Sequence, residues 1–315
     1  MRTVDGAAKE KSLFEGTLGL YRVPRRAALK VRDGFFDGFK PSWTRENQKF
    51  DYSFSSAQGA GFRFTYNDFG EKAGFPSKLL GCVRALHRVY SADTWEAVLK
   101  AARPFGSLHQ TTFGMEWGPG RPLPRLKLYL EDLHLHYPPE TRWAMAASMA
   151  WAAGIEWGIW DRTQYAPAAL CIDFFPDGRR EMKCYGMATT PATMLKVLRD
   201  WGAGPLRRLL DFQRVVKSEK EAFFYFTDRR DAQAKLLSIK WYKIYEVRRI
   251  RDFGPALRET DELWGRSPGP RGIREGFLAC CRDLRLQVYP TIASMDLRPD
   301  GGWEVDVYYS ARRGL

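Results

Sequence analysis

Cys171-Ile-Asp-Phe-Phe-Pro-Asp-Gly178 opens a pattern that this chain repeats, and the repetition decides the fold. In each copy an apolar–acid–apolar triplet leads into a Pro/Gly turn, and a strand of alternating polar and apolar residues follows. The other copies begin at Gly114-Met-Glu-Trp117 and Ser294-Met-Asp-Leu297. A hairpin that recurs at a long period indicates a fold built by stacking one supersecondary unit.

Alternation along the chain predicts five hairpins separated by helices. In the first hairpin, Lys49-Phe-Asp-Tyr-Ser-Phe-Ser55 and Phe62-Arg-Phe-Thr-Tyr66 alternate strictly on either side of a Gly-rich turn. The other hairpins are predicted over about residues 111–131, 168–186, 209–227 and 287–310. Helices are predicted over about residues 93–102, 140–157, 230–249 and 272–284, with a further one starting at Thr190-Pro191.

The two faces of these strands differ in character. Phe62 and Phe64 lie on one face and Arg63 on the other, because successive residues of a strand point to opposite sides. The same rule groups Lys127 with Tyr129, Lys183 with Tyr185, and places Tyr308 opposite Val307. An open sheet with water on its polar side is the alternative. Repeated pairing of Lys or Arg with Tyr, without the Lys/Glu mixture of a solvated surface, favours ten strands closed around a polar lumen.

Composition narrows the class of protein. The 315 residues allow one large domain or two ordinary ones, and a hydrophobic content of 44% is ample for a core. Lysine and arginine exceed aspartate and glutamate by 50 − 37 = 13, so the surface attracts anions: nucleic acid, an anionic membrane or a phosphate-bearing substrate. Five cysteines, with Cys280 next to Cys281, suit a reducing compartment. The most apolar stretch, 145–160, contains Glu156 and is too short to span a bilayer, so a cytoplasmic protein is expected.

Acidic residues recur at equivalent places in the first strands of the hairpins, at Glu116, Asp173 and Asp296. They could pair with the lysines to hold the barrel geometry, which we favour, or help to bind Mg²⁺. His134-Leu-His136 is a weak metal-binding string, because it lacks Cys or acidic partners at ligand spacing. The chain has no Gly-rich phosphate loop, no Ser/His/Asp constellation and no Asp-Asp-x-x-Asp motif. A pocket lined by cations is therefore expected rather than a metal cluster.

With these features, residues 35–312 resemble the ABBA prenyltransferases, at Arg63, Lys127-Leu-Tyr129 and Lys183-Cys-Tyr185. The cyanobactin peptide prenyltransferases look most similar, on the strings Phe35-Phe-Asp-Gly-Phe39, Leu126-Lys-Leu-Tyr-Leu130, Ile172-Asp-Phe-Phe-Pro-Asp-Gly178 and Phe224-Tyr-Phe-Thr-Asp-Arg-Arg-Asp231. The resemblance implies an α+β fold, a barrel of about ten antiparallel strands (five β-hairpins) with a solvent-filled polar lumen and an outer ring of helices. Residues 35–315 would form this single domain, after an N-terminal arm or short helix over residues 1–34.

The implied activity is transfer of a dimethylallyl or geranyl group from its pyrophosphate to an electron-rich acceptor, through an allyl carbocation. The implied pyrophosphate-binding residues are Arg63, Lys127, Lys183 and Arg312, and the implied carbocation shield is Tyr129, Tyr185, Tyr225 and Tyr308. Asp51 matches the position of the family's catalytic acidic residue on the first strand, with a shorter side chain. Five of these residues have alternative roles without chemistry: Lys127 and Lys183 as surface lysines, Asp51 as a solvated strand residue or a partner of Lys49, Tyr225 as a core residue, and Arg312 as part of a basic tail.

The expected partners are the prenyl pyrophosphate donor and an acceptor side chain on a ribosomal cyclic peptide, with a small aromatic metabolite (an indole or phenol) as the alternative acceptor. Mg²⁺ could assist, no organic cofactor is expected, and a monomer without membrane or nucleic-acid partners is expected. The competing class is a basic nucleic-acid-binding protein without catalysis. Its basic residues would form runs with aromatic residues, whereas Lys and Arg are dispersed in this chain. A barrel that binds hydrophobic ligands without turnover is a further alternative.

Overall fold

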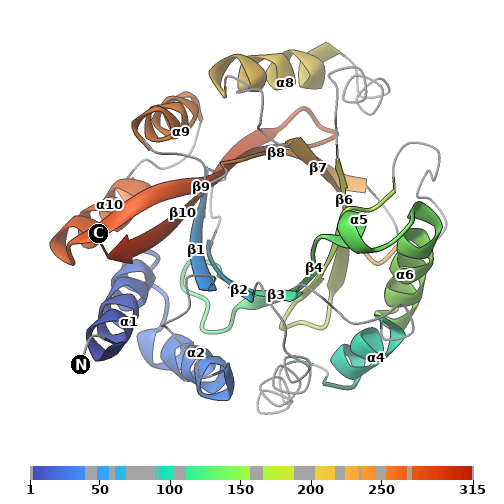
Figure 1. Cartoon of the computed structure of the whole chain (residues 1–315), viewed down its shortest axis with the longest axis horizontal. Coiled ribbons are helices and arrows are strands. Elements are labelled where there is room, and N and C mark those ends of the chain that lie inside the picture. Colours follow the sequence, from blue (N-terminus) through green and yellow to red (C-terminus); the bar gives the residue numbers. More distant parts are fainter. Residues whose placement is uncertain are drawn as a thin grey trace.

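Ten strands close into one antiparallel barrel with helices around it (Figure 1). The computed structural model describes residues 3–39, 48–56, 61–68, 90, 92–102, 111–156, 166–187, 203–216, 224–233, 236–245, 253–267 and 272–313. The strands are β1 (Gln48–Ser55), β2 (Phe62–Asp68), β3 (Thr111–Trp117), β4 (Arg125–Leu130), β5 (Ala169–Phe174), β6 (Arg180–Met187), β7 (Phe224–Arg230), β8 (Leu236–Ile244), β9 (Leu286–Leu297) and β10 (Trp303–Arg313). Each strand pairs with its sequence neighbours, and β1 pairs with β10. The predicted barrel is confirmed.

Helices lie outside the barrel in Figure 1. The described ones are α1 (Thr3–Leu20), α2 (Arg25–Phe39), α4 (Ala92–Ala102), α5 (Leu133–His136), α6 (Pro139–Ala152), α8 (Ala203–Val215), α9 (Gly254–Arg266) and α10 (Gly272–Asp283). None of these helices is both long enough and apolar enough to cross a lipid bilayer. The segment 1–34, predicted as an arm or short helix, contributes α1 and the larger part of α2, and the division into 1–34 and 35–315 stays a prediction about folding units.

The hydrophobic core fills the space between the outer face of the barrel and the helices. Phe62 and Phe64 of β2 are almost fully buried, as the alternation predicted. The ring of Phe14 from α1 packs edge-on against them, with centroid distances of 5.7 and 5.2 Å, and against Trp117 at 5.4 Å. Burying aromatic rings of this size is the main favourable term for holding a helix on a sheet. The opposite face of each strand is thereby directed into the lumen.

Two glycines show how the sequence shapes the lumen. Gly178 adopts a φ of 84°, a left-handed conformation that glycine tolerates, in the turn between β5 and β6. Gly114 faces the lumen opposite Lys127 in the register of β3 and β4. A Cβ atom at Gly114 would lie 3.3 Å from the Lys127 Cβ and 3.4 Å from Tyr129 Cε2. The missing side chain leaves room for Lys127 and Tyr129 to project inward.

The fourth hairpin differs from the prediction. Residues 209–216 were predicted as a strand, but they form the end of α8 and the residue after it; Leu209, Phe212, Val215 and Val216 are buried at helical spacing. Residues 230–249 were predicted as a helix, but 236–244 form β8. Trp241 is buried on the outer face while Lys240 and Tyr242 face the lumen, so the true period is two. The helix predicted from Thr190-Pro191 lies outside the described residues.

Candidate active site

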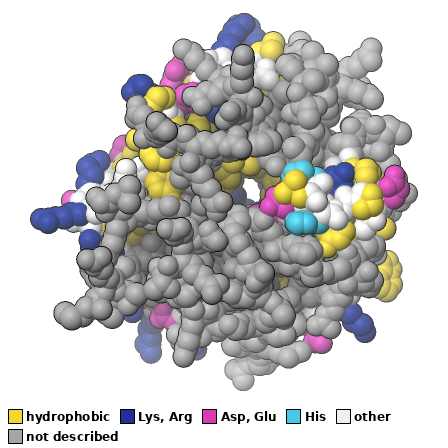
Figure 2. Space-filling view, in the orientation of Figure 1, with side chains coloured by type: hydrophobic (Ala, Val, Ile, Leu, Met, Phe, Trp, Pro, Cys, Tyr) yellow, Lys and Arg dark blue, Asp and Glu magenta, His cyan; other side chains and the backbone are white. Residues whose placement is uncertain are grey.

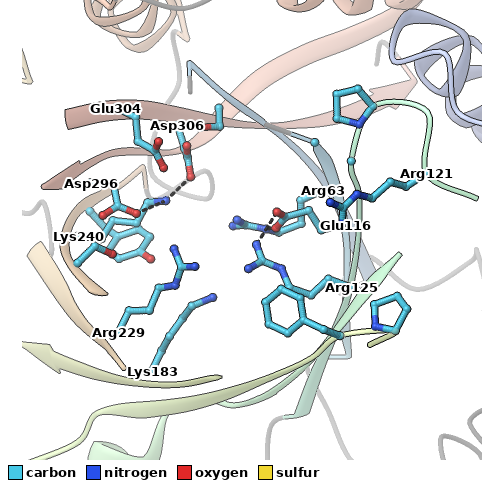
Figure 3. A pocket seen from close by; sticks show the side chains of 18 of the residues that line it. Arg63, Glu116, Arg121, Arg125, Lys183, Arg229, Lys240, Asp296, Glu304 and Asp306 are labelled. Atoms are coloured by element: carbon cyan, nitrogen blue, oxygen red, sulfur yellow. Dashed lines mark hydrogen bonds and ion pairs between the residues drawn. The ribbon is translucent and has the colours of Figure 1, made fainter. Parts of the chain in front are cut away.

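A cavity of about 530 Å³ lies within the barrel (Figure 3). Its lining comes from inward-facing residues near one end of the strands and from the turns that join β3 to β4 and β5 to β6. Four cations from four strands converge on its centre, and we call them the cationic wall: Arg63, Arg125, Lys183 and Arg229. Because these four positive charges repel one another, neighbouring groups must hold their side chains in position.

Buried carboxylates hold the cationic wall in place. Arg63 Nε donates to Glu116 Oε2 at 3.0 Å, and Arg125 pairs with the other oxygen of the same carboxylate. Lys183 Nζ donates to Asp173 Oδ2 at 2.6 Å. Arg229 Nε donates to Glu181 Oε2 at 2.9 Å. These contacts show Glu116 and Asp173 in the structural, lysine- and arginine-pairing role that the sequence favoured.

Asp173 is the centre of this network, with a side chain that is 0% exposed. Its Oδ2 accepts from Lys127 Nζ at 2.9 Å as well as from Lys183, and Arg125 Nη1 lies 3.2 Å away. Burial alone would raise the pKa of Asp173, but Lys127, Lys183 and Arg125 hold it well below the usual range. Arg125, Lys127 and Arg63 likewise outweigh burial and lower the pKa of Glu116. Both carboxylates therefore stay ionised.

Tyrosine rings lie beside the cationic wall. Tyr185 and Tyr242 line the cavity, with ring centroids 5.7 Å apart, and Tyr129 lies next to Tyr185 at 6.4 Å. Tyr308 accepts a hydrogen bond of 2.6 Å from Arg63 Nη1 through its hydroxyl. Burial raises the pKa of Tyr129 and Tyr185, so these phenols stay neutral at physiological pH. Neutral aromatic faces attract cations without forming a bond to them.

The structure brings together Arg63, Lys183 and Tyr185 of the predicted site in the lining of the cavity. Lys127 is 0% exposed and lies among Asp173, Glu116 and Gly114, under the cationic wall. The side chains of Tyr225 and Arg312 lie outside the described part of the structure, although the register places Tyr225 opposite Tyr242 and Arg312 opposite Gln287.

Asp51 lies on β1, opposite Ser310 in the register, and is not among the residues that line the cavity. Its Oδ1 accepts hydrogen bonds from Ser310 Oγ at 2.6 Å and from Thr291 Oγ1 at 3.3 Å. The residue is 8% exposed. Both of these hydroxyl groups come from the other side of the barrel seam, from β9 and β10, and the side chain of its suggested alternative partner, Lys49, lies outside the described residues.

Sequence reasoning missed several residues of the cavity, including Arg125, Arg229, Lys240, Tyr242 and Glu304. Lys240-Trp-Tyr242 is a third copy of the Lys-x-Tyr pattern, after Lys127-Leu-Tyr129 and Lys183-Cys-Tyr185. That repetition was the available signal, and the incorrect helix over 230–249 concealed it. Arg125 shares the parity of Lys127, so the alternation rule alone would have directed it inward.

Acidic residues lie across the cavity from Arg63 and Arg125, and we call them the acidic wall: Asp296, Glu304 and Asp306 (Figure 3). Asp306 pairs with Lys240 Nζ, and Asp296 Oδ2 lies 3.7 Å from the same nitrogen. Burial and the charges of Asp306 and Asp296 raise the pKa of Glu304 to about 7. Cations and carboxylates thus alternate around the cavity.

Stability is expected to depend on pH through Glu304. Its pKa is about 7 in the folded state and near 4.5 when exposed, so the folded state holds the proton more tightly and loses stability as pH rises from about 4.5 to about 7. Glu304→Gln removes the ionisation and should raise the free energy of unfolding by about 1–3 kcal/mol at pH 8, with a smaller gain at pH 5. Urea unfolding at both pH values checks this. Equal effects at pH 5 and pH 8 would contradict the shift.

The described residues give no support for a protein-bound metal ion. Within them, no group of three or more His, Cys, Asp or Glu side chains is arranged to hold one. His134 and His136 belong to the short helix α5, and Figure 2 shows the histidine side chains on the molecular surface there. The carboxylates of the cavity face lysines and arginines instead.

Comparisons with known proteins agree with this geometry at the level of fold. No protein-family model matches the chain, and no curated protein matches it significantly. The 5-dimethylallyltryptophan synthase from Streptomyces coelicolor gives a TM-score of 0.70 at 15% identity, over 95% of this chain and 95% of that one. The 6-dimethylallyltryptophan synthase from Micromonospora olivasterospora, in complex with DMASPP and Trp, gives 0.66 at 13%, over 95% and 96%. NotF, in complex with brevianamide F and DMSPP, gives 0.57 at 15%, over 97% and 94%.

Similarity at such low identity establishes the fold alone, which is the barrel of the aromatic prenyltransferases. The predicted ABBA-type architecture is therefore confirmed. These structures give no support to the narrower similarity to the cyanobactin peptide prenyltransferases, because they are dimethylallyltryptophan synthases and a relative that was solved with brevianamide F.

Proposed function

We propose that this chain is a prenyltransferase that moves a dimethylallyl or geranyl group from its pyrophosphate to an electron-rich aromatic small molecule such as an indole. One observation carries the proposal: the cationic wall converges inside a barrel cavity that tyrosine rings also line. Cations fit the pyrophosphate, and neutral rings fit the allyl cation that forms when it leaves. The likeness of the whole barrel to dimethylallyltryptophan synthases supports the same reading.

In the proposed reaction, the C1–O bond of the donor breaks and the pyrophosphate leaves with the bonding electron pair. Arg63, Lys183 and Arg229 would stabilise the negative charge that develops on the leaving oxygen, at positions already fixed by Glu116, Asp173 and Glu181. Lys127 would act indirectly, because its hydrogen bond to Asp173 helps to hold the carboxylate that positions Lys183. Such preorganised charges cost no reorganisation at the moment of bond cleavage.

The tyrosines would protect the allyl cation until the acceptor attacks it. Tyr185 and Tyr242 line the cavity, and Tyr129 and Tyr308 lie against cavity-lining residues. An aromatic wall keeps water from the cation and attracts the positive charge. An aromatic carbon of the acceptor then forms the new bond to C1, and the proton on that carbon must pass to a base. We propose Asp51 for this role, as the sequence resemblance implies.

The ligands bound in the structurally similar proteins help to choose between the two acceptor classes. Two of those structures contain tryptophan or brevianamide F. They favour the small aromatic acceptor, which was the alternative reading of the sequence, over the peptide side chain that was the first reading. The non-catalytic nucleic-acid reading is less favoured, because the cationic wall lies inside the barrel, where a single strand of nucleic acid would have to enter a cavity of about 530 Å³.

An acceptor panel tests the function directly. The protein is incubated with dimethylallyl or geranyl pyrophosphate and one acceptor at a time: tryptophan, brevianamide F or a cyclic peptide containing tyrosine. We expect tryptophan or brevianamide F to gain the mass of one prenyl group by mass spectrometry, and Asp51→Asn to slow that gain by about 10²-fold. Mass gain on the peptide alone would overturn the acceptor class. No gain with any pair, together with nucleic-acid binding that weakens steeply with salt, would overturn catalysis.

A further inference from the structure

Most of the cations that line the cavity are already paired with carboxylates. Arg63 and Arg125 share Glu116, and Lys127 Nζ lies 3.4 Å from the same carboxylate. Three further lining cations each have a buried carboxylate of their own: Lys183 pairs with Asp173, Arg229 with Glu181, and Lys240 with Asp306. A cation whose charge is balanced by a neighbouring carboxylate attracts another anion less strongly than an unpaired cation does.

Arg121 differs from these cations, although it lines the same cavity. It is an exposed residue on the turn that joins β3 to β4, and Figure 3 shows its side chain extending from that turn toward the cavity. Its guanidinium has no ion-pair or hydrogen-bond partner among the residues that the structure describes. A guanidinium carries several N–H donors and matches the geometry of a phosphate. Arg121 can therefore bind an anion without first releasing a carboxylate.

The turn that carries Arg121 is held in place by backbone contacts. Gly120 N donates to the carbonyl oxygen of Tyr21 at 3.3 Å, and Arg121 N donates to that of Gly118 at 3.1 Å. A Cβ atom on Gly118 would lie only 3.1 Å from Arg121 Cδ. Glycine at this position thus leaves room for the arginine side chain to lie across the turn. The local sequence Gly118-Pro-Gly-Arg121 therefore places an unpaired cation at the rim of the cavity.

The order of residues along the strands shows which part of a bound donor Arg121 would meet. On β4 the turn comes first, and Arg125, Lys127 and Tyr129 follow at steps of about 7 Å into the barrel. The same order holds on two other strands that start at this end of the barrel: Lys183 precedes Tyr185 on β6, and Lys240 precedes Tyr242 on β8. The tyrosines are thus deepest, the paired cations lie above them, and Arg121 is nearest the rim.

We propose that Arg121 binds the distal phosphate of the prenyl pyrophosphate, so that the protein distinguishes a pyrophosphate donor from a monophosphate. The inference rests on the proposed prenyltransferase function and adds a specificity-determining residue to it. The prenyl group would lie among the deep tyrosines, and the phosphate attached to its C1 among the paired cations. The distal phosphate would then point back toward the turn and meet the unpaired guanidinium. A monophosphate has no group that reaches this position.

The test measures how tightly dimethylallyl pyrophosphate and dimethylallyl monophosphate bind, by calorimetry without an acceptor. We expect Arg121→Gln to weaken binding of the pyrophosphate by about tenfold and to leave binding of the monophosphate unchanged. Arg121→Lys keeps the positive charge and should recover part of the loss. In steady-state kinetics with tryptophan, Arg121→Gln should raise KM for the pyrophosphate with little change in kcat, because the distal phosphate is remote from the breaking bond.

Arg179→Gln is the matched control. Arg179 lies on the neighbouring turn, between β5 and β6, where its side chain is 60% exposed and pairs with Asp177. It is not among the residues that line the cavity. The control lowers the net charge by the same amount as Arg121→Gln, so a general effect of charge on anion binding would appear in both variants. We expect Arg179→Gln to bind both ligands as the wild type does.

The outcomes separate this inference from the proposed function. If Arg121→Gln weakens binding of both ligands equally, or of neither, Arg121 does not bind the distal phosphate; prenylation of any acceptor would still support the prenyltransferase. A rise in KM for tryptophan but not for tryptamine, with donor binding unchanged, would assign Arg121 to the carboxylate of the acceptor and overturn the inference. If no acceptor turns over, the proposed function is wrong. Calorimetry still decides in that case: selective loss of pyrophosphate binding supports the phosphate site, and any other result overturns it.

Discussion

Asparagine in place of Asp173 is expected to lower the free energy of unfolding by about 3–5 kcal/mol. The Asp173 carboxylate is 0% exposed and contacts Lys127 Nζ at 2.9 Å, Lys183 Nζ at 2.6 Å and Arg125 Nη1 at 3.2 Å. The variant keeps the shape but removes the only charge that all three cations share in these contacts. Buried cations are then left facing one another at low dielectric, which favours the unfolded chain. Urea unfolding of the purified variant measures the loss.

Asp177→Asn is the control for that experiment. Asp177 lies on the same hairpin, in the turn after β5, and its side chain is 55% exposed with Arg179 as its ion-pair partner. Exposed pairs of this kind contribute little, so the variant should unfold within about 0.5 kcal/mol of the wild type. If Asp173→Asn were as stable as this control, the carboxylate would not be what holds the cations in the lumen.

Glutamine in place of Lys183 is expected to lower kcat/KM for the prenyl pyrophosphate by about 10²- to 10³-fold. Lys183 Nζ belongs to the cationic wall, and its partner Asp173 fixes its position. The lost charge would have opposed the negative charge that grows on the departing oxygen. Because inorganic pyrophosphate would bind to the same cations, its inhibition constant should rise in the same variant. Steady-state kinetics with and without added pyrophosphate measure both effects.

Arg266→Gln serves as the control for Lys183→Gln. It removes a positive charge from α9, outside the barrel, where the side chain is 56% exposed. Both kinetic quantities should match the wild type, since net charge falls equally in the two variants. If Lys183→Gln behaved like Arg266→Gln, the cationic wall would have no part in binding the pyrophosphate. Substitution at Lys127 is less informative, because that side chain is fully buried and its loss would also affect folding.

Parity along single strands made much of the barrel predictable. The alternation of Phe62, Arg63 and Phe64 requires no tertiary information, and it placed Arg63 in the lumen. The same reasoning placed Lys183 and Tyr185 there. Parity does not show, however, whether an inward-facing side chain reaches the cavity or stays buried beneath its lining. Lys127 has the inward parity of a ligand-binding residue, yet the closure of the barrel puts it beneath Asp173, without exposure.

Parts of the site depend on pairing between strands that are distant in sequence. The acidic wall meets Lys240 only because β8 pairs with β9 and β9 with β10, so that Asp296 lies opposite Lys240. A single sequence gives no sign of this register. The period of β8 was also ambiguous, since Leu237, Trp241 and Ile244 happen to fit a helix. Long-range pairing, rather than local propensity, therefore brought Lys240 and the acidic wall together.

The seam between β1 and β10 joins the first strand of the barrel to the last. Asp51 and Ser310, 259 positions apart, are hydrogen-bonded across it, and Arg63 reaches Tyr308 over 245 positions. During synthesis on the ribosome, β1 must therefore wait for nearly the whole chain before its partner emerges. Until then, the growing sheet has two free edges, which invite pairing with other chains. Newly made molecules would thus be most prone to aggregate just before β10 emerges, and a nascent chain arrested before residue 303 should need chaperone protection that the closed barrel does not.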